Sequence, residues 1–334
     1  MKVLIVNGSE VQKLLPMGEC IDVMSDALAA LARGDAILPL RPILWLPEKV
    51  GALGMMPAYL GNIQSVGLKV VTVFPGNHGT KFDSHQGAVL LFETGHGQLL
   101  SIMDASSITA IRTAAVSGLA TRLLAREDSS TVAILGSGVQ ARTHVEAMIN
   151  ARPIKNIRVW SRNAERVSKF VEREAKHRSI EVVVAGSAQE AVRGADIICT
   201  TTSSQEPVLQ GEWIAPGAHI NAVGSSVAFA RELDTAAVTN ARLYVDRRES
   251  TLNESGDFII AKKEGAIGDD HIVGEIGDVI LGRVKGRRSN DEITLFKSLG
   301  LAVEDLAAAN HIYRKATDTD AGTLIELGGE RDED

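Results

Sequence analysis

The segment Val132–Ala141 constrains the fold of this chain more than any other. An apolar, β-branched run, Val132–Leu135, is followed at once by a G-x-G-x-x-A turn and a helical pattern. The first glycine of such a turn allows a tight bend, the second lets backbone N–H groups approach a pyrophosphate, and the small alanine lets the helix pack against the strand. The pattern alone is weak evidence, because glycine turns after strands are common. It predicts a dinucleotide held by Gly136, Ser137, Gly138, Val139 and Gln140.

The residues that follow strengthen this interpretation. Helical patterns at Gln140–Asn150 and Asn163–His177 alternate with apolar strand-like runs, as in a parallel sheet that is covered on both faces. With the first strand, the further runs supply the six strands of a complete dinucleotide-binding fold: Ile157–Trp160, Glu181–Val184, Ala195–Thr200, His219–Val223 and Arg242–Val245. The predicted fold class is therefore α/β, with a doubly wound Rossmann domain. We also assign the following residues to cofactor binding: Thr113, Thr200, Thr201, Val223, Gly224 and Ser225.

The end of the second strand indicates which dinucleotide is preferred. NAD-binding folds usually carry an acidic residue there, which accepts hydrogen bonds from the ribose hydroxyls. This chain instead reads Trp160-Ser161-Arg162-Asn163, without an acid. We therefore expect Ser161 and Arg162 to hold a 2′-phosphate, which favours NADP(H) and leaves NAD(H) as the alternative. The alternative is that Arg162 stacks on the adenine or is a solvated loop charge.

Length and charge limit the classes of partner. A chain of 334 residues is longer than a usual single core, so we expect two domains. The net charge of −7 and the scattered basic residues argue against a nucleic-acid partner. No apolar run has the length of a membrane span or a signal peptide, so we expect a cytoplasmic protein without a membrane partner. The two cysteines, Cys20 and Cys199, are interpreted as buried thiols, and the histidine spacing predicts no metal site.

The residues before and after the Rossmann segment form a second pattern, of the α+β type. It begins with a helix at Cys20–Arg33 and several strands: Leu44–Leu46, Gly51–Met55, Val66–Phe74, Ala88–Glu93 and Leu99–Asp104. After the sixth Rossmann strand we expect a turn-rich region at Asn253–Arg288, then helices at Asp291–Leu299 and Ala302–Arg314. The charged, glycine-bearing Gly328–Asp334 is expected to be a loose tail.

Two basic residues stand in surroundings that are otherwise nearly uncharged. Lys69 lies in the apolar run Val66–Phe74, and Arg112 lies in the small, apolar helical stretch Ile108–Leu119. Burying a lone cation is costly, so we expect an anion or a cofactor beside each of them. The alternative for Lys69 is an edge-strand side chain that reaches water. Arg41 carries less weight on its own, because loop arginines are usually solvated.

The chain resembles the ornithine cyclodeaminase/mu-crystallin family over nearly its whole length. Apart from the glycine loop, the landmarks are Met56-Pro57-Ala58-Tyr59, Gly67-Leu68-Lys69-Val70-Val71, Ile111-Arg112-Thr113-Ala114-Ala115 and Ile293–Gly300. The resemblance implies a homodimer, with a substrate-binding and dimerisation domain at 1–116 and 303–334 around a Rossmann domain at 117–302. It also implies that Arg41, Lys69 and Arg112 grip the carboxylate of a small imino or amino acid, and we add Met56 and Ser226 as substrate-binding residues.

The chemistry of these side chains indicates their roles. A carboxylate held by two guanidinium groups and an ammonium has a fixed orientation, so that its α-carbon can receive a hydride from the nicotinamide. These cations repel a positively charged iminium, so the substrate nitrogen needs a proton donor within the site. We predict that Lys69 is this donor, with a pKa lowered by the neighbouring arginines, and that Lys69 and Arg112 are the catalytic residues.

Two positions differ from the pattern of the cyclodeaminases. The family resemblance places an acidic residue two positions before Met56 and an aspartate at position 226, whereas this chain has Gly54 and Ser226. A serine is no carboxylate base near neutral pH. We therefore predict an NAD(P)H-dependent reductase of small α-imino acids or cyclic ketimine carboxylates, or an amino-acid dehydrogenase in reverse. The alternatives are an ornithine cyclodeaminase-type lyase that recycles bound NAD, and a non-enzymatic protein that binds NADPH or a ligand, like mu-crystallin.

Overall fold

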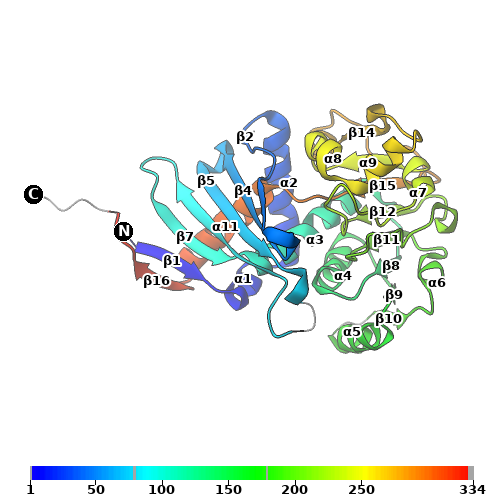
Figure 1. Ribbon diagram of the computed structural model, residues 1–334, viewed down its shortest axis with the longest axis horizontal. Coiled ribbons are helices and arrows are strands. Elements are labelled where there is room, and N and C mark those ends of the chain that lie inside the picture. Colours follow the sequence, from blue (N-terminus) through cyan, green and yellow to red (C-terminus); the bar gives the residue numbers. More distant parts are fainter. Residues whose placement is uncertain (1, 78–79, 178–179, 330–334) are drawn as a thin grey trace, which may run out of the picture. The chain divides into compact units, whose positions relative to one another are not determined.

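The computed structural model describes residues 2–77, 80–177 and 180–329. The chain divides into two compact units, which we call the first unit (Met1–Arg112 with Leu301–Asp334) and the second unit (Thr113–Gly300) (Figure 1). The first division falls inside helix α3 (Ala105–Leu124). Both divisions lie within a few residues of the boundaries predicted from the sequence at 116/117 and 302/303.

The first unit is built on one mixed sheet with the strand order β16-β1-β7-β6-β5-β4-β2, and β3 also pairs with β4. Its centre is a run of long antiparallel strands, each joined to the next along the chain, and β1 joins β7 in parallel. The strands are β1 (Lys2–Val6), β2 (Ala36–Ile37), β3 (Ile43–Trp45), β4 (Ala52–Leu60), β5 (Ser65–Val73), β6 (His85–Glu93), β7 (Leu99–Asp104) and β16 (Thr323–Glu326).

Two long helices cover this sheet. Helix α2 (Met17–Arg33) ends at Gly34 in the left-handed conformation, and α11 (Ala302–Asp318) packs against α2 and against strands β4, β5 and β6 (Figure 1). The approach of α11 to β5 is close, since a Cβ atom at Gly67 would lie 2.8 Å from Leu306 Cδ1 and 2.7 Å from the carbonyl oxygen of Leu90. A glycine at this position therefore allows α11 to lie directly on β5. A shorter helix, α1 (Gly8–Leu14), precedes α2.

The second unit is a Rossmann-type sheet of eight strands in the order β10-β9-β8-β11-β12-β15-β13-β14. All neighbouring strands are parallel, and the central ones are buried on both faces, as a sheet with helices on each side requires. The strands are β8 (Thr131–Leu135), β9 (Asn156–Trp160), β10 (Glu181–Val184), β11 (Ile197–Thr200), β12 (His219–Ala222), β13 (Arg242–Val245), β14 (Ile272–Glu275) and β15 (Thr294–Lys297).

The connections of the second unit are mostly helical. Besides the carboxyl-terminal part of α3, they are α4 (Val139–Ala151), α5 (Ala164–His177), α6 (Ala188–Val192), α7 (Thr235–Thr239), α8 (Arg248–Glu254), α9 (Gly256–Lys263) and α10 (Ile276–Ile280). Single 3-10 turns occur in both units, at η1 (Pro47–Lys49), η2 (Gly61–Ile63), η3 (Pro75–Asn77), η4 (Gly211–Trp213) and η5 (Asp269–His271).

Two predictions about the end of the Rossmann segment are wrong. The segment Asp291–Leu299 is not helical, because its residues Thr294–Lys297 form β15, which inserts between β12 and β13. Lys297, which ends this strand, is buried and forms an ion pair with Asp257. The region Asn253–Arg288 is not mainly turns, since it contains α9, β14 and α10. Its polar residues include helix caps, such as Ser255, whose side chain accepts the N–H of Phe258 at the start of α9.

Two further findings apply to the described part of the chain. None of its helices has both the length and the apolar character that crossing a membrane requires. Among the same residues, no three His, Cys, Asp or Glu side chains are grouped so that they could hold a metal ion. The predicted loose tail, Gly328–Asp334, lies outside the described residues from position 330 onwards.

Candidate active site

A cluster of four charged side chains lies inside the first unit. Lys69 comes from the middle of β5, Arg112 from α3, and Glu304 and Asp305 from the first turn of α11. We call these four residues the buried charge cluster, since none of them is more than 4% exposed. Acidic residues in the first turn of a helix are stabilised by its dipole, so α11 is a favourable place for the two carboxylates.

The charges of the cluster form a chain of ion pairs from Lys69 through Asp305 and Arg112 to Glu304. Lys69 Nζ lies 2.7 Å from Asp305 Oδ2, and Arg112 Nε donates to Asp305 Oδ1 at 2.9 Å. Arg112 Nη1 donates to Glu304 Oε2 at 2.8 Å, so Arg112 contacts both carboxylates. Lys69 Nζ also donates a long hydrogen bond of 3.4 Å to Thr109 Oγ1. Two cations and two anions therefore balance one another in a site that water does not reach.

The surroundings shift the pKa values of this cluster. Burial lowers the pKa of Lys69 to about 8; the Asp305 carboxylate opposes this shift, and the cations Arg112 and Arg41 add to it. Burial by itself would raise the pKa of Asp305, but Arg112 and Lys69 together hold it below its ordinary value. Lys69 is thus an ammonium at neutral pH that loses its proton at a much lower pH than a surface lysine.

The anion predicted beside Lys69 and Arg112 is a side chain of the protein itself, Asp305. Asp305 pairs with both cations and Glu304 pairs with Arg112, so the burial of Lys69 does not by itself require a bound substrate. The sequence analysis missed Glu304 and Asp305, because acids at a helix start are usually solvated caps. The available signal was their position within Ala302–Ala309, a stretch that is otherwise apolar and is buried throughout.

The other predicted substrate residues of the first unit lie close to Lys69. Met56 on β4 is directly opposite Lys69 on β5 in the antiparallel register, and its side chain is buried. Arg41 is half-buried between β2 and β3, near enough to influence the pKa of Lys69. Gly54 pairs with Val71, and a Cβ atom at Gly54 would meet Val71 Cγ1 at an ordinary 3.7 Å. The backbone therefore has room for a side chain at position 54, on the same face of β4 as Met56.

In the second unit, the glycine loop between β8 and α4 has the shape that a pyrophosphate needs. Gly136 has φ of +132°, and a Cβ atom there would lie 2.6 Å from Thr201 Oγ1. Gly138 is the N-cap of α4, where no side chain caps the helix and a Cβ atom would point into open space. The first backbone N–H groups of α4 therefore point toward open space that an anion can occupy. The residues of this loop fit a dinucleotide phosphate. Val139 is 66% exposed beside them.

Predicted cofactor residues from neighbouring strands meet at the same edge of the sheet. Ser137 Oγ donates to Ser161 Oγ at 3.0 Å, which joins the loops after β8 and β9, and Arg162 is exposed on the second of these loops. Thr201 Oγ1 donates to the carbonyl of Leu135, and the N–H of Val223 donates to the carbonyl of Thr200.

The remaining predicted residues of this unit differ in exposure. Thr113 is buried on α3, directly after Arg112 in the sequence. Ser225 is also buried, and its hydroxyl is used within its own loop, where it donates to the carbonyl of Ala230. Ser226 is exposed.

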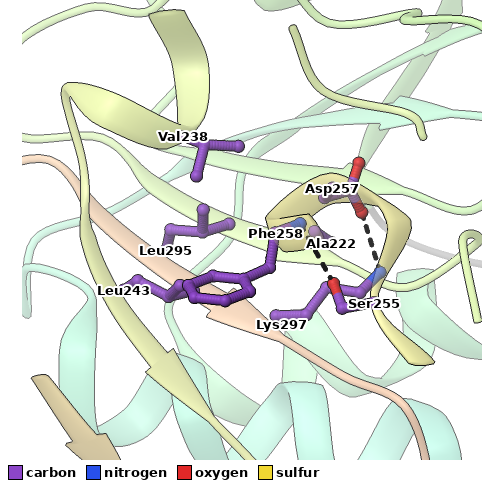
Figure 2. A pocket seen from close by; sticks show the side chains of 8 residues that line it. All are labelled: Ala222, Val238, Leu243, Ser255, Asp257, Phe258, Leu295 and Lys297. Carbon is purple, nitrogen blue, oxygen red and sulfur yellow. Dashed lines mark hydrogen bonds and ion pairs between the residues drawn. The ribbon is translucent and has the colours of Figure 1, made fainter. Parts of the chain in front are cut away.

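The buried carboxylate of Glu232 connects the loops after β11 and β12 by hydrogen bonds, and the sequence analysis did not identify this residue. Glu232 accepts hydrogen bonds from Thr200 Oγ1, from the N–H and Oγ1 of Thr202, and from the N–H of Gly224. Burial raises its pKa above the ordinary value. The backbone N–H of Glu232 in turn donates to Asp257, which forms an ion pair with Lys297 beside an apolar pocket (Figure 2). This network holds the strand ends where a dinucleotide would lie.

The second unit is a Rossmann-type domain with an open phosphate loop, and the first unit contains buried cations. Together they define the class of NAD(P)-dependent oxidoreductases. The chain belongs to the ornithine cyclodeaminase/mu-crystallin family, whose sequence profile matches residues 1–320. The mouse (Mus musculus) ketimine reductase mu-crystallin is 44% identical over 296 residues, which cover 88% of this chain and 90% of that protein.

Two solved structures extend this comparison. The Δ1-pyrroline-2-carboxylate reductase of Thermococcus litoralis, solved with NADH and L-proline, is 41% identical with a TM-score of 0.94. That match covers 96% of this chain and 99% of the other. An archaeal alanine dehydrogenase dimer with bound NAD is 34% identical with a TM-score of 0.92, over 98% of this chain and 100% of the other. The predicted family and fold class are confirmed.

Proposed function

We propose that this protein reduces the C=N bond of small α-imino acids or cyclic ketimine carboxylates with NAD(P)H, and that in reverse it oxidises the amino acid. The observation that carries the proposal is the buried charge cluster, in which an ammonium with a pKa of about 8 lies next to a guanidinium. The relatives named as ketimine and Δ1-pyrroline-2-carboxylate reductases support the same reaction.

The cations around Lys69 fit a substrate that carries a carboxylate. Arg112 and Arg41 lie near enough to Lys69 to lower its pKa. Their guanidinium groups can orient a carboxylate through paired hydrogen bonds. Met56, opposite Lys69 on the neighbouring strand, supplies an apolar wall for the substrate side chain.

Lys69 is the proposed proton donor of this reaction. When bound, the reduced nicotinamide supplies a hydride to the imine carbon. The imine nitrogen then needs a proton, and an ammonium with a pKa of about 8 gives one up more readily than an ordinary lysine. Arg112 remains protonated throughout and acts only by binding and orientation.

For the cofactor, we favour NADPH over NADH. No acid follows β9 to repel a 2′-phosphate, and Ser161 and Arg162 offer a hydroxyl and a planar guanidinium at this position. The glycine loop from Gly136 to Gln140 would hold the pyrophosphate. The Thermococcus litoralis reductase and the archaeal alanine dehydrogenase were solved with NADH and with NAD, which keeps NAD(H) as the alternative.

We further propose that the protein is a homodimer in the cytoplasm. Large apolar side chains of the kind that a second copy would cover are exposed near one edge of the first unit's sheet, on β2, on β3 and directly after η1: Ile37, Ile43, Leu44, Trp45 and Val50. The archaeal alanine dehydrogenase relative is itself a dimer. Cys20 and Cys199 are free thiols, which is compatible with a reducing compartment.

A panel of substrates tests the proposed reaction. Purified protein is mixed with NADPH or NADH and with pyrroline-2-carboxylate, with a six-membered cyclic ketimine carboxylate, or with pyruvate and ammonia or methylamine. We expect stoichiometric loss of the reduced cofactor's absorbance and formation of the amino acid. L-ornithine with catalytic NAD is the contrasting reaction, and we expect little or no proline from it, since position 54 is a glycine and position 226 a serine. Proline formation from ornithine would indicate the lyase, and cofactor binding without any turnover would indicate a binding protein.

A further inference from the structure

The carboxylate of Asp305 lies between the two cations of the buried charge cluster. Its Oδ2 is 2.7 Å from Lys69 Nζ and its Oδ1 is 2.9 Å from Arg112 Nε. Lys69 is on a strand and Arg112 is on another helix, so this one carboxylate links two elements that no shared backbone hydrogen bonds connect. Asp305 is 1% exposed, and its position is therefore set by the packing of α11 and not by solvent.

We propose that Asp305 is a positioning residue that holds the ammonium of Lys69 and the guanidinium of Arg112 at a fixed separation and keeps Lys69 charged until the substrate takes its proton. This inference rests on the proposed reduction of a C=N bond. It assigns a function to a residue on α11 that lies outside the predicted set of substrate residues.

The charged groups around Lys69 explain why Asp305 is the residue that keeps its proton. Burial disfavours the ammonium, and the cations Arg112 and Arg41 disfavour it further. Asp305 is the anion that opposes these effects, while Thr109 contributes a weak, neutral contact at 3.4 Å. Without the Asp305 carboxylate, the pKa of Lys69 would be lower still, and a smaller fraction of Lys69 would carry the proton that the imine nitrogen needs.

The proton transfer balances with the proposed reduction. The imine carbon receives a hydride, the C=N π bond becomes the new lone pair on nitrogen, and this nitrogen takes a proton as a Lys69 Nζ–H bond breaks. The imine is reduced and the dihydronicotinamide is oxidised. Lys69 is then a neutral amine beside the Asp305 carboxylate, a state that favours regaining a proton from water after the product leaves.

Glu304 provides a matched control within the same helix turn. It is as buried as Asp305 and also pairs with Arg112, at 2.8 Å, but the ion pair of Lys69 is with Asp305. Removing the charge of Glu304 therefore disturbs the same packing and the same arginine. It leaves the anion next to Lys69 in place.

The experiment compares Asp305→Asn with Glu304→Gln in the full-length protein. The proton on Lys69 is followed by NMR of lysine labelled with ¹³C at Cε, with Lys69→Arg to assign the signal, and kcat/KM for pyrroline-2-carboxylate is measured against pH. We expect Asp305→Asn to lower the titration midpoint of Lys69 and the alkaline limb of kcat/KM together, by about one pH unit or more. Glu304→Gln should shift both by less than half as much. Equal shifts in the two variants, or no shift in Asp305→Asn, would overturn the proposal.

A second variant covers the case in which Asp305→Asn does not fold. Asp305→Glu keeps the charge but lengthens the side chain, so we expect the Lys69 midpoint to stay near that of the wild type while KM rises severalfold. A wild-type KM in this variant would contradict the positioning role. Absence of turnover by the wild-type protein with every imine would instead contradict the proposed function, and the NMR titration would still decide whether Asp305 controls the charge of Lys69.

Discussion

Lys297 Nζ lies 2.9 Å from Asp257 Oδ2, and both side chains are almost completely buried. Lys297 ends β15 and Asp257 lies in the first turn of α9, so the pair joins the sheet to a covering helix. Asp257 also accepts the backbone N–H groups of Glu232 and Leu233. Through these contacts, a charge in the centre of the second unit fixes the segment that carries Glu232.

The first prediction concerns this pair. Lys297→Met leaves the Asp257 carboxylate buried without its cation, which should lower the free energy of unfolding by about 3–5 kcal/mol. Lys315→Met is the control, because it removes a lysine from an ion pair with Glu19 on the surface and should cost about 1 kcal/mol or less. Urea denaturation of the three proteins measures both losses. Similar losses in the two variants would mean that the buried pair contributes no more than a surface pair.

The second prediction concerns Arg112. Arg112→Ala removes the guanidinium that orients the substrate carboxylate, and kcat/KM should fall by about two to three orders of magnitude. The same change leaves Glu304 and Asp305 with less positive charge, so the melting temperature should fall as well. The dissociation constant of NADPH, measured by fluorescence titration, should change far less. Near-normal kcat/KM in a folded variant would show that Arg112 only neutralises the two carboxylates.

The third prediction concerns cofactor choice. NADPH should bind more tightly than NADH, and Arg162→Ala should weaken NADPH binding by about ten- to hundredfold, which is the usual strength of a hydrogen bond to an ionised group. NADH binding should hardly change, since it lacks the 2′-phosphate. Titration of NADPH and of NADH into the wild type and into Arg162→Ala gives the four dissociation constants. A wild-type preference for NADH, or equal losses for the two cofactors, would mean that Arg162 does not contact the phosphate.

The fourth prediction concerns stability in acid. Burial lowers the pKa of His144 to about 4 and that of His219 to about 3, so both are neutral in the folded protein at pH 5. In the unfolded chain they bind protons below about pH 6.5. The unfolded state thus gains protons first, and the stability present above pH 6.5 should be lost progressively as the pH falls toward 4.

Substitution of His144 measures its share of this loss. Its ring is fixed by Gln140 and Ser117, with Nδ1 2.7 Å from the carbonyl of Gln140 and Nε2 2.9 Å from Ser117 Oγ. His144→Gln should therefore lower stability at pH 7 but make the curve between pH 7 and pH 4 flatter, by about 3 kcal/mol over this range. Thermal melts at several pH values test this. A curve parallel to that of the wild type would show that His144 does not titrate on unfolding.

Much of the second unit could be predicted from the sequence, because the signals there are local. The glycine loop, the strands β8 to β13 and helices α4 and α5 each have their own pattern of apolar residues and glycines. Strand β15 could not be predicted in the same way. It ends in a lysine, and the burial of that lysine depends on Asp257, which is 40 residues away.

In the first unit, too, local sequence patterns predicted only part of the candidate site. The sequence identified Lys69 and Arg112 as cations that need a partner, because each stands among apolar residues. The identity of the partner depends on α11 packing over β5, and Asp305 is 193 residues from Arg112 in the chain. A local pattern can mark Glu304 and Asp305 as acids within an apolar stretch, but it carries no information on which cations they contact.

The discontinuous first unit has a consequence for how the chain matures on the ribosome. Lys69 and Arg112 emerge early, but Glu304 and Asp305 on α11 emerge only after the whole of the second unit. The second unit is continuous, so a nascent chain can fold it while the sheet of the first unit still lacks its covering helix. The buried charge cluster is therefore completed only after the second unit, and a nascent chain gains the ability to bind its dinucleotide before it can hold an imino acid.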